Sequence, residues 1–342
     1  MPRRPAVRLL RRFDSPQPLA RPSRPVRRGR SIAPVILGFM LAAGGCGGSP
    51  PPVVPAPGPS LAAPAAGTAS AAGIPAPTRL HPEPNVYGLV TLPGDVVTMR
   101  YQAGFLDRAA RLQFRLEPAL KRFDGLGELD RLGVRTYVLS RDEWQRSGLG
   151  MPYGVPVRVG HTALAAPADG DDASVRLWAD LGVVLPGVAS SSLRGTPQQA
   201  SALALADVIS VLQIAEIAVD RTRLGGDAFW VRGFVTHLAA ADHLRREEPD
   251  TAQDLAQVWR QVATLRPPRT ARLEDYRPEM DLAEWLWFQA AFAQAADSVI
   301  EDEGRGVLRR LRKLGEDGLT GAELIDRYPQ LGIWRDAWFS AF

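Results

Sequence analysis

The residues that could do acid–base, nucleophilic or metal chemistry are few and poorly grouped in this chain of 342 residues. The chain has four histidines, His81, His161, His237 and His243. The last two are six positions apart, a spacing that does not put both on one face of a helix. We therefore expect each histidine to be an ordinary surface or core-edge residue. The run Ser190–Ser192 lacks the Gly-x-Ser-x-Gly setting of a nucleophile elbow, and Gly125–Gly133 lacks the lysine of a phosphate-binding loop.

The polar residues with the most regular spacing lie in and just beyond the apolar segment Leu203–Leu212. Four of them recur at steps of three: Asp207, Ser210, Gln213 and Glu216. This pattern predicts a helix that is buried over most of its circumference and carries one narrow polar stripe. A second apolar segment, Ala228–Ala239, follows Asp227, a good N-cap, and predicts a second buried helix. A site would form from the facing residues of these two helices.

The elements around this pair change in kind along the chain. Before it, the apolar spacing predicts two short strands in Val86–Tyr101 around a turn at Leu92–Asp95, the amphipathic helix Leu106–Phe123 with a kink at Pro118, and strands at Val134–Leu139 and Val155–Val159. After it, the pattern predicts helices at Asp254–Leu265, Leu282–Ile300, Val307–Leu314 and Ala322–Tyr328. We assign no element to residues 165–200. Strands first and helices after indicate an α+β fold.

The second helical segment contains Phe229-Trp-Val-Arg-Gly-Phe-Val235. With the order of elements, it resembles the gluzincin metallopeptidases, specifically the peptidase-MA-like domains of bacteria. In that family one helix carries H-E-x-x-H and the next carries Trp-x-x-Glu-Gly-Phe/Leu-Ala; two histidines and the later glutamate bind zinc. Gly233 and Phe234 match the second signature, Phe229 stands at its tryptophan and Trp230 one place later. Leu205–Leu212 takes the place of the first signature. The resemblance implies a zincin-like fold, with a strand–helix–strand lobe before a mainly helical half.

The resemblance also implies that the zinc chemistry is lost. Ala206 and Ser210 stand at the two histidine positions, Asp207 at the general base and Arg232 at the third ligand. A methyl group and a hydroxyl cannot replace two imidazoles, and a guanidinium repels Zn²⁺. We therefore predict a degenerate peptidase without catalytic residues, metal or other cofactor. A carboxylate between two apolar helices needs a partner, so we expect Arg232 to pair with Asp207 or Ser210. The alternative interpretation is an unrelated helical pair that matches the signature by chance.

The first 45 residues differ in composition from the rest of the chain. They hold ten arginines and one acid, and they end in the apolar run Ile32–Ala43 and two glycines before Cys46, the only cysteine. This order predicts a secretory signal peptide, and Ala43-Gly-Gly-Cys46 resembles the lipobox of bacterial lipoproteins. We therefore expect a lipid on Cys46. An ordinary signal peptide with an incidental cysteine is the alternative.

Removing this segment reverses the net charge of the protein. The whole chain carries +4 and residues 1–45 carry ten arginines and one aspartate, or +9, so the mature chain carries −5. The basicity belongs to the signal peptide, and nucleic acid loses its main support as a partner.

Residues 46–84 are rich in proline, alanine, glycine and serine, which predicts a disordered tether before a peptidase-MA-like domain over residues 85–342. We expect an exported lipoprotein of the cell envelope, held by its lipid at the outer membrane or the periplasmic face if the cell is Gram-negative. The expected role is that of a pseudoenzyme in binding or assembly, with a protein or peptide ligand in the former substrate cleft. The alternative function is an active hydrolase whose site the sequence does not reveal.

Overall fold

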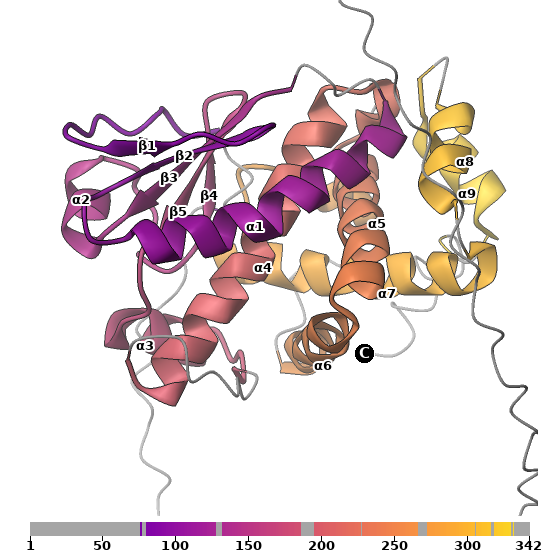
Figure 1. Ribbon diagram of the computed structural model, residues 1–342. Helices are drawn as coiled ribbons and strands as arrows, with labels where there is room; N and C mark the ends of the chain where they lie inside the picture. The colour runs from indigo at the N-terminus through magenta and orange to yellow at the C-terminus, as the bar shows by residue number, and fades with distance from the viewer. Residues whose placement is uncertain are drawn as a thin grey trace, which may run out of the picture. The chain divides into compact units, whose positions relative to one another are not determined.

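The computed structural model describes residues 76, 80–127, 132–185, 195–226, 228–265, 272–304, 306–315, 318–329 and 331. The predicted signal peptide, Cys46, most of the tether, Ser190–Ser192 and Asp227 lie outside the described residues. The described part joins a five-stranded sheet to a half made of helices (Figure 1). The predicted α+β class is therefore confirmed.

The sheet is mixed and has the order β1-β2-β3-β5-β4. Its strands are β1 (Val90–Leu92), β2 (Val97–Tyr101), β3 (Val134–Leu139), β4 (Val157–Val159) and β5 (Ala163–Pro167). The inner pairs β2–β3 and β3–β5 are parallel, while β1 and β4 pair antiparallel with their neighbours at the two edges. The strands expected from the sequence are present, and β5 is an additional strand whose residues are all buried.

Two helices, α1 (Leu106–Phe123) and α4 (Pro197–Asp220), pack on the sheet and on each other. Helix α1 contacts β2, and α4 contacts β5 and β4 (Figure 1). Helix α1 has the predicted bounds and continues through Pro118. Proline donates no backbone hydrogen bond, so the carbonyl of Phe114 lacks its helical partner. Both Phe114 and Pro118 are exposed, which lets water reach this part of the helix.

Helix α4 starts earlier than the apolar segment suggested, at a capping box. The Thr196 hydroxyl accepts from the Gln199 backbone N–H at 3.3 Å, and the Gln199 side chain accepts from the Thr196 N–H at 2.9 Å. The helix is long and apolar enough to cross a membrane, but most of it is buried inside the fold, as in the core helix of a soluble protein. Of the predicted polar stripe, Ser210, Gln213 and Glu216 are buried.

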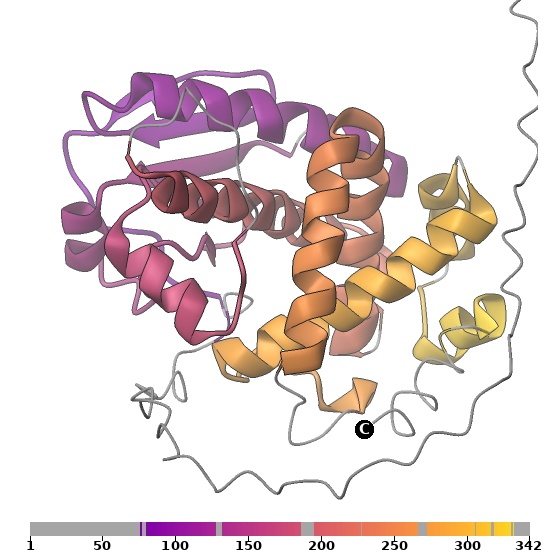
Figure 2. The ribbon, with the colours of Figure 1, turned by 90° about the horizontal axis from the view of Figure 1, so that it is seen from below.

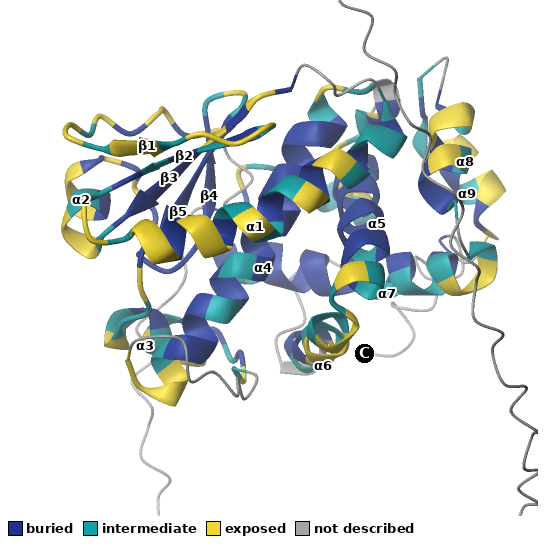
Figure 3. Ribbon diagram, in the orientation of Figure 1, coloured by how far each residue is buried: buried dark blue, intermediate teal, exposed yellow. Residues whose placement is uncertain are grey.

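The helical half centres on α5 (Phe229–Glu247), which packs against α4 and α7 (Leu282–Glu303). The other helices are α2 (Arg141–Arg146), α3 (Asp172–Asp180), α6 (Pro249–Leu265), α8 (Val307–Leu314), α9 (Gly321–Arg327) and the short 3₁₀ turns η1 (Asp124–Leu126), η2 (Arg223–Gly225) and η3 (Leu273–Asp275). Figure 2 shows α7 running across α5. A Cβ at Gly233 would lie 2.5 Å from the Phe292 ring, so this glycine permits the crossing. Buried residues concentrate in α4, α5 and α7 (Figure 3).

The chain before β1 belongs to the fold further back than its composition suggests. His81 pairs with the outer edge of β4: its N–H donates to the Arg158 carbonyl at 3.3 Å, and its carbonyl accepts from Gly160 at 2.8 Å. Ala76 is buried, and its N–H donates to the Met280 carbonyl at 3.0 Å, just before α7. His81 therefore lies at an edge of the sheet, although the sequence placed it in the tether.

Candidate functional site

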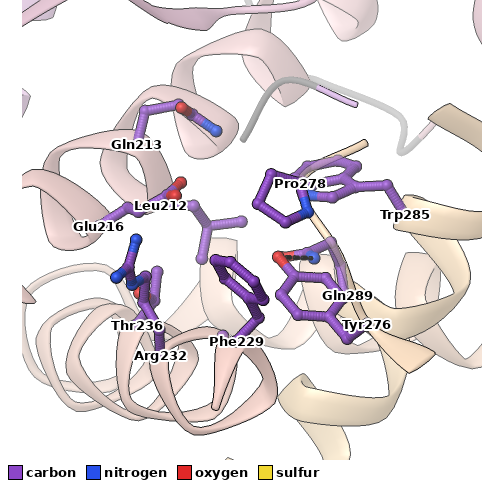
Figure 4. Close-up of a pocket in the computed structure, with 11 residues that line it drawn as sticks. Leu212, Gln213, Glu216, Phe229, Arg232, Thr236, Tyr276, Pro278, Trp285 and Gln289 are labelled. Carbon is purple, nitrogen blue, oxygen red and sulfur yellow. Dashed lines mark hydrogen bonds between the residues drawn. The ribbon is translucent and has the colours of Figure 1, made fainter. Parts of the chain in front are cut away.

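A pocket lies between α4, α5, the segment after η3 and the start of α7 (Figure 4). Its cavity has a volume of about 30 Å³. The lining residues come from four segments: Leu212, Gln213 and Glu216; Phe229, Arg232, Gly233 and Thr236; Tyr276 and Pro278; Trp285 and Gln289. The polar residues of α4 and α5 lie on one side, and aromatic rings and a proline lie on the other (Figure 4).

Arg232 is held at this pocket by an acid that the sequence did not single out. Its Nε lies 3.1 Å from a carboxylate oxygen of Asp220, the last residue of α4. The same carboxylate accepts a hydrogen bond from Arg158 of β4, a guanidinium that is itself buried. The end of α4 is thus joined to α5 and to the edge of the sheet by one acid and two arginines.

The predicted pair between Arg232 and Asp207 is wrong. Asp207 accepts hydrogen bonds from both terminal nitrogens of Arg108, which lies on α1 and is only 4% exposed. Ser210 donates to the Ala206 carbonyl at 2.9 Å, within its own helix. The reason is axial position: thirteen residues separate Asp207 from Asp220, or about 20 Å along a helix that rises 1.5 Å per residue. Arg232 beside Asp220 cannot reach Asp207.

The four predicted zinc-site positions do not come together, because Arg232 lies beside the C-terminal end of α4. Arg232 faces the last turns of α4, where Leu212, Gln213 and Glu216 line the same pocket. Ala206 and Ser210 are buried one to two turns earlier in the helix, away from that pocket. The structure therefore brings Arg232 together with a different part of the polar stripe than the sequence interpretation did.

Glu216 is the buried acid of the pocket, with 6% of its surface exposed. Burial raises the pKa of its carboxyl from the ordinary 4.5 to about 8; nearby Arg158 opposes this rise, Asp220 adds to it, and Arg232 opposes it. Near neutral pH the carboxyl is mostly protonated and uncharged. The excess of guanidinium over carboxylate charge at this end of α4 then makes the pocket wall positive.

The residues matching the family signature divide into packing and pocket roles. Trp230 and Phe234 are buried, and the centroids of the Phe234 and Tyr328 rings lie 6.5 Å apart. Phe229, the first residue of α5, is 38% exposed and lines the pocket. The guanidinium carbons of Arg232 and Arg277 lie 5.7 and 6.0 Å from its ring centroid. The N-cap of α5 is Ala228, whose side chain accepts no hydrogen bond.

Several polar atoms of the pocket lack a partner within the described part of the chain. They are the Gln213 Oε1, the Thr236 Oγ1 and the Trp285 Nε1, and all three side chains are buried. Buried polar groups in proteins are almost always hydrogen-bonded. Water or a ligand in the pocket would complete the bonding of these three atoms.

The two histidines of α5 lie deeper than the sequence suggested, since both are buried. His237 Nε2 lies 2.7 Å from the Gln289 Oε1, and burial lowers the His237 pKa to about 4. The His243 ring packs edge-on against Phe123, and burial also lowers its pKa. Both are neutral core residues at pH 7, while His161 is exposed as expected.

The sequence interpretation missed most of the pocket's far wall. Tyr276, Pro278 and Trp285 come from a loop and a helix start that no motif marks, and only the fold brings them to α4 and α5. Gln213 and Glu216 were visible in the sequence as part of the polar stripe. Their step of three was the available signal, although it does not tell which turn of the helix faces a neighbour.

The residues do not fit the zinc ion that gluzincin metallopeptidases bind. Zinc sites use imidazole, thiolate and carboxylate ligands, whereas Arg232 brings a cation and Leu212 brings no donor atom. Among the described residues there is no group of three or more His, Cys, Asp and Glu side chains placed to hold a metal.

Comparisons of the chain with known protein families, with curated proteins and with solved structures find no match in any of the three.

Proposed function

We propose that this protein is a lipid-anchored envelope protein whose folded domain is a degenerate gluzincin-type metallopeptidase. It works by binding a peptide or protein segment in the pocket between α4, α5 and α7, without a catalytic metal. The observation that carries the proposal is the shared pocket of Glu216 and Arg232, on two adjacent buried helices where the family has its site.

The pocket also gives the resemblance a better register. Leu212, Gln213 and Glu216 have the 1, 2, 5 spacing of H-E-x-x-H, and they face the residue that stands at the family's third ligand, Arg232. The earlier register put the first motif at Ala206, six residues or about 9 Å further along the helix axis. In both alignments other residues replace the zinc ligands. We therefore propose binding of a ligand, without zinc-dependent catalysis, as the activity of the pocket.

A gain of zinc binding tests this register. The variant Leu212→His/Gln213→Glu/Glu216→His/Arg232→Glu should bind one equivalent of Zn²⁺, because two imidazoles and a carboxylate would then converge. The matched control, Ala206→His/Asp207→Glu/Ser210→His/Arg232→Glu, carries the same side chains in the displaced register and should bind none tightly. Zinc content is measured after gel filtration, with circular dichroism to verify the fold.

The proposal fails if the first variant folds and holds no zinc, or if both variants hold it equally. Because four changes in a packed core can unfold the protein, the smaller variant Leu212→His/Glu216→His provides a second measurement. Its two imidazoles, one helical turn apart, should bind Zn²⁺ more tightly than wild type, and equal affinity would count against the register.

One observation favours the alternative, a hydrolase. A carboxyl with a pKa near 8 in a pocket is the kind of group that serves as a general acid. A hydrolase of this type would cleave peptides in the wild type and lose that activity in Glu216→Gln. Under the binding proposal both proteins leave the peptides intact, which mass spectrometry of the incubated mixture decides.

A further inference from the structure

We infer that the pocket recognises a carboxylate on its peptide ligand, held by the guanidinium groups of Arg232, in the first turn of α5, and of Arg277, in the segment between η3 and α7. This inference rests on the proposed function, since it names the chemical group that the binding pocket takes. The group is either the C-terminal carboxylate of a chain or the side chain of an acidic residue.

The first observation is the charge at the mouth of the pocket. Arg232 and Arg277 both lie over the exposed ring of Phe229, at 5.7 and 6.0 Å from its centroid. Within the described part of the chain, Asp220 is the acid paired with Arg232, and that acid is shared with Arg158. Arg277 donates to the backbone carbonyl of Tyr276 at 2.8 Å. Two cations on one ring with a shared acid leave positive charge that an anion would neutralise.

The second observation is the position of Arg232 on α5. Arg232 is the fourth residue of a 19-residue helix, near the end where the helix dipole is positive and cations are unfavourable. The N-cap Ala228 offers no side-chain acceptor to the N–H groups of the first turn. An arginine beside an uncapped helix start does not help the isolated helix, whereas both features favour a bound anion.

The third observation lies inside the pocket and is independent of the helix end. Trp285 is buried, and its Nε1–H has no acceptor in the described part of the chain. An indole nitrogen can only donate, so it calls for an acceptor. The hydroxyl of Thr236 can also donate, and its buried Oγ1 has no partner on this pocket within the described part of the chain. An ionised carboxylate accepts through two oxygens and donates nothing, which matches the Trp285 N–H and the Thr236 hydroxyl; the unpartnered Gln213 Oε1 only accepts and calls for a water instead.

The size and walls of the pocket fit such a group. A cavity of about 30 Å³ holds roughly two waters, or one carboxylate in their place. The acid of Glu216 does not cancel the positive wall near pH 7, because burial keeps it mostly protonated. Phe229, Tyr276 and Pro278 form an apolar rim that would contact the side chain next to the carboxylate (Figure 4).

Three small probes test the inference on the full mature chain by isothermal titration calorimetry at pH 7. They are N-acetyl-phenylalanine, its carboxamide, and N-acetyl-aspartic acid carboxamide. The free acid should bind at least tenfold more tightly than its carboxamide, because only the acid offers an ionised group. Binding of the aspartic acid probe at the level of the free acid would identify a side-chain carboxylate as the source; its absence would identify the C-terminus.

Variants then place the group at the two arginines. Arg277→Gln changes an exposed residue, and Arg232→Gln leaves Asp220 paired with Arg158; each should weaken the free acid at least tenfold and leave its carboxamide unchanged. The matched control Arg312→Gln, on the exposed face of α8, should bind like wild type. If Arg232→Gln unfolds, the comparison of Arg277→Gln with wild type alone tests the role of the arginines.

Equal affinity for the acid and the carboxamide, or for wild type and Arg277→Gln, overturns the carboxylate inference while leaving a binding pocket in place. Absence of binding by all probes also overturns it. The gain-of-zinc variants judge the proposed function separately, because their result does not depend on any of these probes.

Discussion

The buried carboxyl of Glu216 should make the protein less stable as the pH rises. Its pKa is about 8 in the folded protein against an ordinary 4.5, so between these values the folded state holds a proton that the unfolded state has released. Stability from this group is therefore full below pH 4.5 and is lost as the pH rises to about 8. Each pKa unit corresponds to about 1.4 kcal/mol, so a difference of 3.5 units corresponds to roughly 5 kcal/mol.

Glu216→Gln removes this dependence, because an amide has nearly the same shape and does not ionise. Relative to wild type, the variant should gain about 3.5 kcal/mol of unfolding free energy between pH 5 and pH 8. Urea denaturation followed by circular dichroism at both pH values measures the difference. The control Glu274→Gln changes an exposed glutamate of η3 and should follow the wild type at both pH values.

The reasoning is refuted if the difference between Glu216→Gln and wild type is the same at pH 5 and pH 8. That result would mean that Arg158 and Arg232 hold the carboxyl ionised despite its burial. In that case the pocket wall would lose its positive charge at pH 7, and the carboxylate inference would weaken with it.

Three further outcomes follow from other residues. Cys46→Ser should release the protein from membranes or block its processing, as membrane fractionation of the expressing cells would show, and unchanged retention would remove the lipoprotein proposal. Asp207→Ala should lower the unfolding free energy by about 3–5 kcal/mol, because it leaves the guanidinium of Arg108 buried and unpaired; in the same urea assay, removing the exposed Asp95 should change little. The pKa of His237 falls from 6.5 to about 4 on burial, so acid should destabilise the protein over that interval, and His237→Gln should remove about 3 kcal/mol of this loss in urea titrations at pH 6.5 and 4.

Several elements with a clear apolar period were predictable to within a residue or two, whereas α6 starts five residues before the predicted Asp254 and α7 ends three residues after the predicted Ile300. Helix α1 and strand β3 have the predicted bounds, because the apolar residues of α1 recur at helical steps and β3 is a short run of mostly β-branched and aromatic residues. Strand β5 was missed because it is Ala-Leu-Ala-Ala-Pro, which lacks the β-branched residues that favour strands and is buried on both faces. The start of α4 was missed although the capping residues Thr196 and Gln199 were visible in the sequence.

The site was only partly predictable. The spacing of residues along a helix shows which residues share a face, but it does not show which turn of that face contacts a neighbouring helix. The stripe containing Asp207 and Glu216 was correct as one side of a helix. The structure gives its two ends different partners: Arg108 of α1 for Asp207, and the pocket with Arg232 for Glu216. Which residues of two helices pair depends on the axial position of one helix against the other. The periodicity of a single sequence contains no information on that position.

The hydrogen bond between Ala76 and Met280 fixes where the chain enters the domain: two residues from Pro278 in the pocket wall. Thirty positions separate Ala76 from Cys46, a span that cannot exceed roughly 110 Å at 3.6 Å per residue. If Cys46 carries a lipid, the segment that joins the domain to the membrane enters the domain next to the wall of the pocket. The pocket would then meet ligands on the same membrane at an effective concentration set by the length of this segment. With the lipid in place, shortening residues 47–75 would change which partners the pocket reaches without altering any residue that lines the pocket.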